Sequence, residues 1–239
     1  MKVTLIINGK MARVAKGTTL LEAARGLGIT IPTLCYHRSL KSYGACRLCV
    51  VEVVKRGRRK VVTSCNHPCE EGLEVLTETP ALQNSRRLTL ELLLARCPDV
   101  ETMKALGKRM GLASSRFGLK RDGKCILCGL CVRVCAELVC ANAIGLGDRG
   151  TDRVVVTPFD EATESCIGCG SCTYVCPMGC IEMVDDGRGL TLNMDGHKLE
   201  QCAHGQACED CDVDKGFMAD TKAAIQEFRK GIHSPADLG

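Results

Sequence analysis

Cysteine dominates the chemistry available to this sequence, with 19 cysteines among 239 residues. Eight of them form two runs with the spacing C-x2-C-x2-C-x3-C, over residues 125–135 and 166–176. Three thiolates at this spacing can bind one face of a cubane iron–sulfur cluster, while the fourth points away and ligates a neighbouring cluster. The two runs therefore predict a pair of [4Fe–4S] clusters that exchange their fourth ligand.

This interleaving predicts two ligand sets. Cluster A takes Cys125, Cys128, Cys131 and Cys176, and cluster B takes Cys166, Cys169, Cys172 and Cys135. The segment resembles a two-cluster bacterial ferredoxin, in which a proline closes each run. Pro177 stands at that place after the second run, whereas Ala136 departs from the pattern after the first. A pair of zinc sites is the alternative, and the interleaved order of eight cysteines argues against it.

Four more cysteines, Cys35, Cys46, Cys49 and Cys65, have the spacing x10, x2 and x15, which is not the plant-type arrangement. They lie in Ile31–His37, Tyr43–Val53 and Ser64-Cys65. These segments resemble the N-terminal [2Fe–2S] domain of the complex I large subunit and of the small diaphorase subunits of NAD-linked hydrogenases. The resemblance continues through Glu71–Thr77 and Arg87–Ala95 and resumes at Lys124. It implies one [2Fe–2S] cluster held by these four cysteines.

Two alternatives exist at this site. Cys69 follows Cys65 by four residues and could replace it, although the match of Thr63-Ser64-Cys65 to the family favours Cys65. His37 could suggest a Rieske centre, but that centre needs two histidines paired with two cysteines. We therefore expect His37 to be a loop residue.

The sequence departs from this family between the two cluster regions. Members usually carry an additional [4Fe–4S] cluster with one histidine and three cysteine ligands, introduced by His-Pro-x-Asp-Cys-x-x-Cys. Here residues 96–103 read RCPDVETM, so Cys97 replaces the histidine and the three cysteines are missing. The resemblance then implies that this cluster is absent and that the electron path is shorter or rerouted.

The C-terminal tail holds a candidate extra metal site, formed by Cys202, Cys208, Cys211 and His204. The pair Cys208-x2-Cys211 can bind a single metal, and a further iron–sulfur cluster or a zinc ion would suit this set. Two remaining cysteines, Cys140 and Cys180, follow the ferredoxin-like runs at similar intervals. We expect both to be small buried hydrophobic residues near the clusters.

The pattern of apolar residues predicts an α+β protein with four segments. Residues 1–77 combine an Asn8-Gly9 hairpin, a short helix over 20–26 and further strands, which fits a β-grasp [2Fe–2S] domain. Residues 78–118 read as a helical linker that starts near Pro80. Residues 119–185 form the two-cluster ferredoxin-like domain. Residues 186–239 form a cysteine-containing tail with a helix predicted over 220–230.

Composition excludes several functions. The 32 basic and 28 acidic residues nearly balance, and the basic run over 55–60 lies between two Val-rich segments, so we expect a solvated hairpin tip rather than a nucleic-acid site. No apolar stretch is long enough for a membrane span, and no signal peptide is apparent. Since an odd number of cysteines cannot pair completely, metal ligation in a reducing cytoplasm is the better explanation.

The resemblance implies an electron-transfer subunit without substrate chemistry of its own. It would relay single electrons between a flavin-containing, NAD(P)H-binding subunit and a second redox subunit, such as a hydrogenase, a formate dehydrogenase or a ferredoxin-linked enzyme. No G-x-G-x-x-G motif follows a predicted strand, so no nucleotide-binding domain is expected. A cluster-based redox or iron sensor and a free polyferredoxin are the alternatives.

Overall fold

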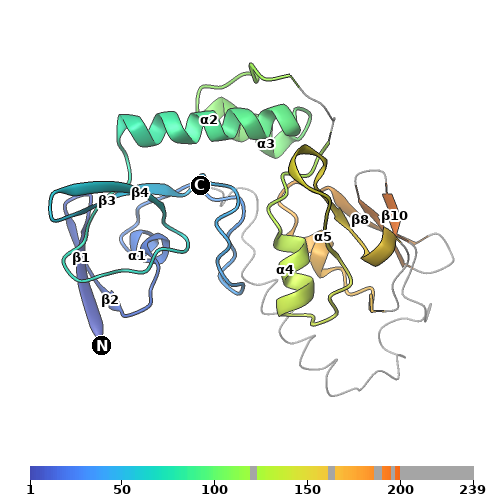
Figure 1. Ribbon diagram of the computed structural model, residues 1–239, viewed down its shortest axis with the longest axis horizontal. Coiled ribbons are helices and arrows are strands. Elements are labelled where there is room, and N and C mark those ends of the chain that lie inside the picture. The colour runs from blue at the N-terminus through green and yellow to red at the C-terminus, as the bar shows by residue number, and fades with distance from the viewer. Residues whose placement is uncertain (119–122, 161–164, 186–189, 195–196, 200–239) are drawn as a thin grey trace.

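The computed structural model describes residues 1–118, 123–160, 165–185, 190–194 and 197–199 (Figure 1). The architecture is α+β, as predicted. An N-terminal sheet with its helix lies at one end, two linker helices run along one side, and two short helices with small sheets lie at the other end (Figure 1). The predicted tail helix over 220–230 lies outside the described residues.

The N-terminal unit is a five-stranded mixed sheet with one helix. Its strands are β1 (Lys2–Ile7), β2 (Lys10–Ala15), β3 (Val50–Lys55), β4 (Arg58–Thr63) and β5 (Glu74–Leu76), in the order β2-β1-β5-β3-β4. Only β1 and β5 pair in parallel. Both hairpins turn through two residues with positive φ, Asn8-Gly9 and Arg56-Gly57, which is the backbone that a tight hairpin requires.

Helix α1 (Leu20–Gly26) packs against this sheet. Thr19 and Glu22 form a reciprocal capping box at its N-terminus, which explains why the helix begins there. Leu20, Leu21 and Ala24 are buried in one apolar core with residues of β1, β3 and β5. The helix and sheet form the predicted β-grasp arrangement.

The linker consists of α2 (Pro80–Arg96) and α3 (Glu101–Arg109). Thr79 caps α2, and Pro80 occupies the first turn, where its missing N–H group costs nothing. The buried Arg86 of α2 donates hydrogen bonds to the carbonyl oxygens of Leu48, Val50 and Thr77. Arg86 therefore attaches α2 to β3 and to the residues beside Cys49.

The C-terminal unit has a short helix in the second half of each cysteine run. Helix α4 (Leu130–Glu137) and helix α5 (Ser171–Val175) both start directly after a left-handed glycine, Gly129 or Gly170. Strands β6 (Gly145–Gly147) and β7 (Val154–Val156) form a two-stranded sheet. Strands β8 (Ile181–Asp185), β9 (Leu190–Met194) and β10 (His197–Leu199) form a second sheet, with β9 in the middle. This sheet continues past residue 186, where the predicted tail begins.

One apolar core joins the two ends of the molecule. It contains Leu34, Leu40 and Cys46 from the loop after α1, Leu90 and Cys97 from the α2 region, and the buried side of α4. The N-terminal loop therefore packs directly against the cysteine-bearing helix of the C-terminal unit. Within the described part of the chain, no helix has the length and apolar character needed to cross a membrane.

Candidate iron–sulfur centres

The four N-terminal cysteines predicted to act together do meet in the structure. Their side chains, Cys35, Cys46, Cys49 and Cys65, are all buried. Cys35 and Cys46 share a hydrogen bond between their thiols, and so do Cys49 and Cys65. These bonds lower the pKa of Cys46 to about 6 and that of Cys49 to about 7. The same hydrogen bonds raise the pKa of Cys35 and Cys65, so one cysteine of each pair favours the thiolate, which is the form that binds iron.

Backbone structure explains why these thiols converge. The amide of Cys46 donates to Sγ of Cys35 at 3.4 Å, and the amide of Leu34 donates to Sγ of Cys46 at 3.5 Å. Ser64 binds the carbonyl oxygen of Cys49 through both its amide and its hydroxyl, at 2.9 and 2.8 Å. The β3–β4 register therefore holds Cys49 next to Cys65.

The structure also places the two alternative residues at this end. Cys69 is buried, and its amide donates to the carbonyl oxygen of Thr18 at 2.8 Å. Burial, together with the nearby Glu22 carboxylate, raises the pKa of Cys69 to about 11. Its surroundings are those of a structural thiol beside α1. His37 is a buried loop residue whose Nδ1 accepts a hydrogen bond from the Ser39 amide at 3.2 Å.

The cysteines predicted for cluster B surround one cavity. The small, partly open cavity has a volume of about 30 Å³ and is lined by Cys135, Cys166, Cys169 and Cys172. Its other walls are glycine and mainly apolar side chains, among them Val139, Ala143 and Ile144. The amide of Ala143 donates to Sγ of Cys135 at 3.3 Å. The fourth thiol of the first run thus faces the three leading thiols of the second.

The cysteines predicted for cluster A are combined in the same way, with three from the first run and one from the second. Burial raises the pKa of Cys131, with further contributions from Cys128, Cys125 and Cys176. The amide of Leu127 donates to Sγ of Cys125 at 3.3 Å. The structure therefore brings Cys176, the last residue of the second run, to the three leading thiols of the first.

The cysteines that follow each run differ from our prediction. Cys140 is exposed, with a positive φ of 59°, so the prediction of a buried residue is wrong for it. The backbone turns outward there to begin the segment leading to β6. Cys180 is half-buried, but its thiol contacts those of Cys176 and Cys125 rather than simply filling space. The spacing of Cys180 after Cys176 was the only signal in the sequence for this contact.

The three thiol groups are neighbours in space. Burial raises the pKa of Cys128 to about 12, and among the smaller contributions is one from Cys46 of the N-terminal group. Likewise, Cys172 of the second run contributes to the raised pKa of Cys131. The order in space is therefore the N-terminal group, then the cluster A group, then the cluster B group.

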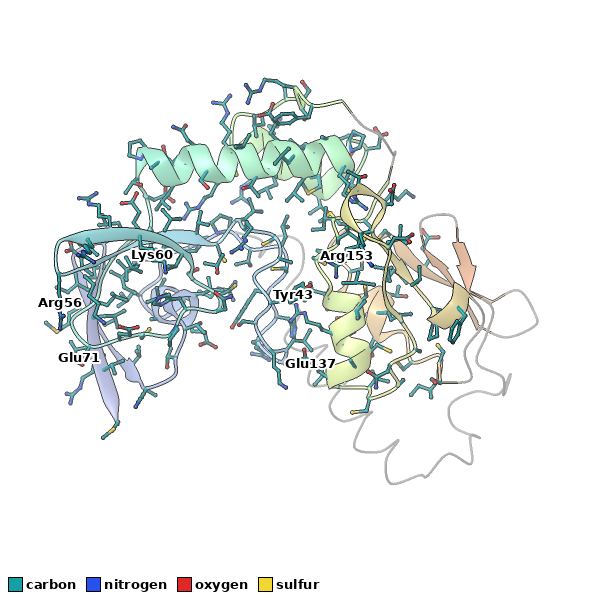
Figure 2. The ribbon with its side chains drawn as sticks, in the orientation of Figure 1. Tyr43, Arg56, Lys60, Glu71, Glu137 and Arg153 are labelled. Carbon is teal, nitrogen blue, oxygen red and sulfur yellow. The ribbon has the colours of Figure 1, made fainter. Side chains whose placement is uncertain are left out.

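Arg133 connects the first two groups. It lies on α4 between Cys131 and Cys135, and its Nη2 donates to the carbonyl oxygen of Cys35 at 2.8 Å. Its Nη1 donates to the carbonyl oxygen of Lys41, and its guanidinium lies 5.4 Å from the centre of the Tyr43 ring. Figure 2 shows Tyr43 between the N-terminal sheet and α4.

Two further contacts complete this interface. The Glu137 carboxylate at the end of α4 accepts a hydrogen bond from the Lys41 amide at 2.8 Å (Figure 2). Gly129 has a positive φ of 71°, which favours glycine, and a Cβ atom built there would lie 3.4 Å from the Tyr43 ring. The loop that bears Cys35 and Cys46 is thus held against α4, the helix that carries Cys131 and Cys135, one cysteine predicted for each [4Fe–4S] cluster.

The arrangement suits polynuclear clusters. In an iron–sulfur cluster the thiolates bind different iron atoms, so they stand apart around a shared volume. The cysteines in the described ranges form no disulfide bonds with one another. The tail candidates, Cys202, His204, Cys208 and Cys211, lie outside the described residues.

Family models match both cysteine-bearing ends. A 2Fe-2S iron-sulfur cluster binding domain matches residues 1–80, and a 4Fe-4S binding domain matches residues 162–182. Together with the fold and the thiol groups, these matches define the class: an iron–sulfur protein with [2Fe–2S]- and [4Fe–4S]-binding domains.

Comparison with known proteins shows which iron–sulfur proteins of this class the chain resembles. One chain in a crystal structure of NAD+-reducing [NiFe]-hydrogenase is 32% identical with a TM-score of 0.58, over 65% of this chain and 74% of that one. The NADPH-Fe(3+) oxidoreductase subunit alpha of Geobacter sulfurreducens is 36% identical, over 74% of this chain and 24% of the relative. The NADP-reducing hydrogenase subunit HndD of Solidesulfovibrio fructosivorans is 34% identical, over 74% and 35%.

The chain belongs to the iron–sulfur protein family that contains this hydrogenase chain and the N-terminal region of the complex I large subunit. It spans about a quarter to a third of the length of the curated relatives named above.

Proposed function

We propose that this chain is an iron–sulfur subunit that relays single electrons within a multisubunit oxidoreductase. At one end it would meet a flavin-containing, NAD(P)H-oxidising or NAD(P)H-reducing partner. At the other it would meet a second redox subunit, such as a hydrogenase, a formate dehydrogenase or a ferredoxin-linked enzyme. The names of the relatives support this proposal, since they describe NADPH-, NADP- and NAD+-linked oxidoreductases.

Three clusters would suit the thiol groups. The [2Fe–2S] cluster takes Cys35, Cys46, Cys49 and Cys65; cluster A takes Cys125, Cys128, Cys131 and Cys176; cluster B takes Cys166, Cys169, Cys172 and Cys135. When bound, these groups supply outer-sphere one-electron transfer. The protein contributes thiolate ligands, N–H donors to the sulfurs, and burial that excludes water, all of which set reduction potentials.

The observation that carries the proposal is the shared core between the N-terminal loop and α4. A simple pair of tethered domains would leave the two cysteine regions at variable distance. Here Arg133, Glu137 and Tyr43 hold them together, and Cys46 lies near enough to influence Cys128. This direct contact supports a relay from the [2Fe–2S] site to cluster A without an intermediate histidine-ligated cluster.

The partners and setting follow from the same features. The described cysteines form no disulfide bonds with one another, which supports a reducing, cytoplasmic location. By family resemblance, the [2Fe–2S] end would face the flavin subunit. The tail would hold a further cluster or a zinc ion if its cysteines bind metal.

Iron analysis with low-temperature EPR of the anaerobically purified chain tests the cofactors. We expect about 10 iron atoms per chain, or about 14 if the tail binds a further [4Fe–4S] cluster. Absence of a [2Fe–2S] signal under mild reduction would overturn the N-terminal assignment.

A variant pair tests the relay itself. With the flavin partner and NAD(P)H present, Cys49→Ser should block reduction of the [4Fe–4S] clusters, while dithionite should still reduce them. The matched control, Cys69→Ser, changes a buried cysteine outside the thiol group and should behave like the wild type. Equal reduction of the [4Fe–4S] clusters in both variants, or purification as a monomer without redox partners, would contradict the proposal.

A further inference from the structure

The cluster A region holds one more thiol than four ligands require. Sγ of Cys180 lies 3.3 Å from Sγ of Cys176. The Cys180 thiol also forms a hydrogen bond with the thiol of Cys125, the first residue of the first run. Cys180 therefore contacts two of the four thiols assigned to cluster A, one from each cysteine run.

The backbone keeps Cys180 in this position. The chain turns back after Cys176, with a hydrogen bond of 3.3 Å from the Gly179 amide to the Cys176 carbonyl oxygen. Gly179 has a positive φ of 62°, which allows this tight turn. The next residue, Ile181, is buried and begins β8. Cys180 is thus fixed between the last ligand and a strand, and it packs against the shared core.

Cluster B has no equivalent thiol among the described residues. Cys140, the cysteine after Cys135, is exposed and does not line the cavity that the four cluster B cysteines surround. The extra thiol is therefore a property of the cluster A site rather than a general result of the repeat.

We propose that Cys180 is a reserve ligand of cluster A that can take the coordination position of Cys176. The inference rests on the proposed assignment of Cys176 to that cluster. In the exchange, the iron–Sγ bond of Cys176 breaks and one to Cys180 forms. The proton of the Cys180 thiol passes to the Cys176 thiolate 3.3 Å away, so the total charge and the oxidation state do not change.

The central test compares two variants of the full chain, purified without oxygen. Cys176→Ala should keep the iron content of the wild type and a reduced [4Fe–4S] EPR spectrum with shifted g-values for one cluster. Cys176→Ala combined with Cys180→Ala should lose about four iron atoms per chain or give a [3Fe–4S] signal after oxidation. Identical iron content and spectra for these two variants would overturn the proposal.

Two controls separate this question from the assignment of the cluster. Cys128→Ala removes a cluster A ligand that is not one of the two thiols in contact with Cys180. This variant should therefore disrupt cluster A even though Cys180 is present. Cys180→Ala alone should keep the wild-type iron content. If the wild type itself lacks a second [4Fe–4S] signal, the proposed function fails. Identical iron content and spectra for Cys176→Ala with and without Cys180→Ala would overturn only the proposal that Cys180 is a reserve ligand.

Thiol labelling gives an independent readout. Under native conditions an alkylating reagent should label Cys180 in the wild type, since it is not bound there, and should not label it in Cys176→Ala. Equal labelling of Cys180 in both proteins would contradict the exchange. If Cys176→Ala does not fold, Cys176→Ser with and without Cys180→Ala provides the same comparison with a smaller change of side chain.

Discussion

Substituting Arg133 should loosen the contact between the two cysteine-bearing ends. Its guanidinium binds the carbonyl oxygens of Cys35 and Lys41 and lies over the Tyr43 ring. Arg133→Met keeps much of the apolar stem but removes the charge and every donor. The helix and its cysteines should remain folded, because the apolar side of α4 is unchanged.

The contacts set the size of the effect. A hydrogen bond from a charged group contributes about 1.5–3 kcal/mol, and a cation–π contact at a partly exposed site about 0.5–1 kcal/mol. The bond to Cys35 is partly buried, whereas the one to Lys41 is exposed and counts for less. We therefore expect Arg133→Met to lower the free energy of unfolding by about 2–4 kcal/mol.

Hydrogen exchange and electron transfer are the assays for Arg133. Amides of residues 35–43 should exchange faster in Arg133→Met, while those of β1 and β2 stay as in the wild type. Electrons delivered to the [2Fe–2S] site should reach the [4Fe–4S] clusters more slowly, with unchanged iron content. Arg58→Met, at the exposed basic hairpin, is the matched control. If Arg133→Met and Arg58→Met show the same loop exchange and stability, the reasoning about this interface is refuted.

Three further predictions concern the scaffold. Arg86→Met leaves three backbone carbonyl oxygens without the guanidinium donor, and it should lower the free energy of unfolding, measured with denaturant, by about 3 kcal/mol. A decrease below about 1 kcal/mol would show that water replaces the guanidinium. Hydrogen bonds from Arg116 hold the pKa of Glu91 at about 2. The stabilising effect of this pair is therefore complete above the unfolded-state pKa of about 4.3, and it is lost as the pH falls toward 2. The stability difference between wild type and Glu91→Gln should therefore be constant from about pH 5 to 8, and a slope in that range would disprove the pairing. Gly129→Ala adds a Cβ atom beside the Tyr43 ring at a residue whose φ is 71°, and it should destabilise the protein by roughly 1–2 kcal/mol in thermal unfolding. Gly118→Ala is the control and should leave the stability unchanged.

Local signals predicted the N-terminal fold well. The Asn8-Gly9 turn and Pro80 each specify backbone structure over a few residues, and the first hairpin and α2 form where these signals stand. The ferredoxin-like half was harder to predict. Its helices are short, at eight and five residues, and its strands carry little periodic pattern, so packing around the thiol groups rather than local propensity determines them.

The cysteine spacing by itself determined which thiols would act together. Since a cluster needs several ligands at set intervals along the chain, the runs over 125–135 and 166–176 predicted both groups and their interleaving, and the structure brings those thiols together. The family resemblance similarly selected Cys65 over Cys69, and the structure places Cys65 with its three companions.

Only the tertiary structure decided how these sites relate to one another. Arg133 and Cys35 are 98 positions apart, and nothing in either segment of sequence predicts their hydrogen bond. The same holds for the different fates of Cys140 and Cys180, which follow their runs at similar spacing. One backbone turns outward to solvent and the other turns into β8, so Cys140 is exposed while the Cys180 thiol contacts that of Cys176. Spacing along a chain specifies ligands within a cluster, whereas distances between clusters depend on packing between segments far apart in sequence.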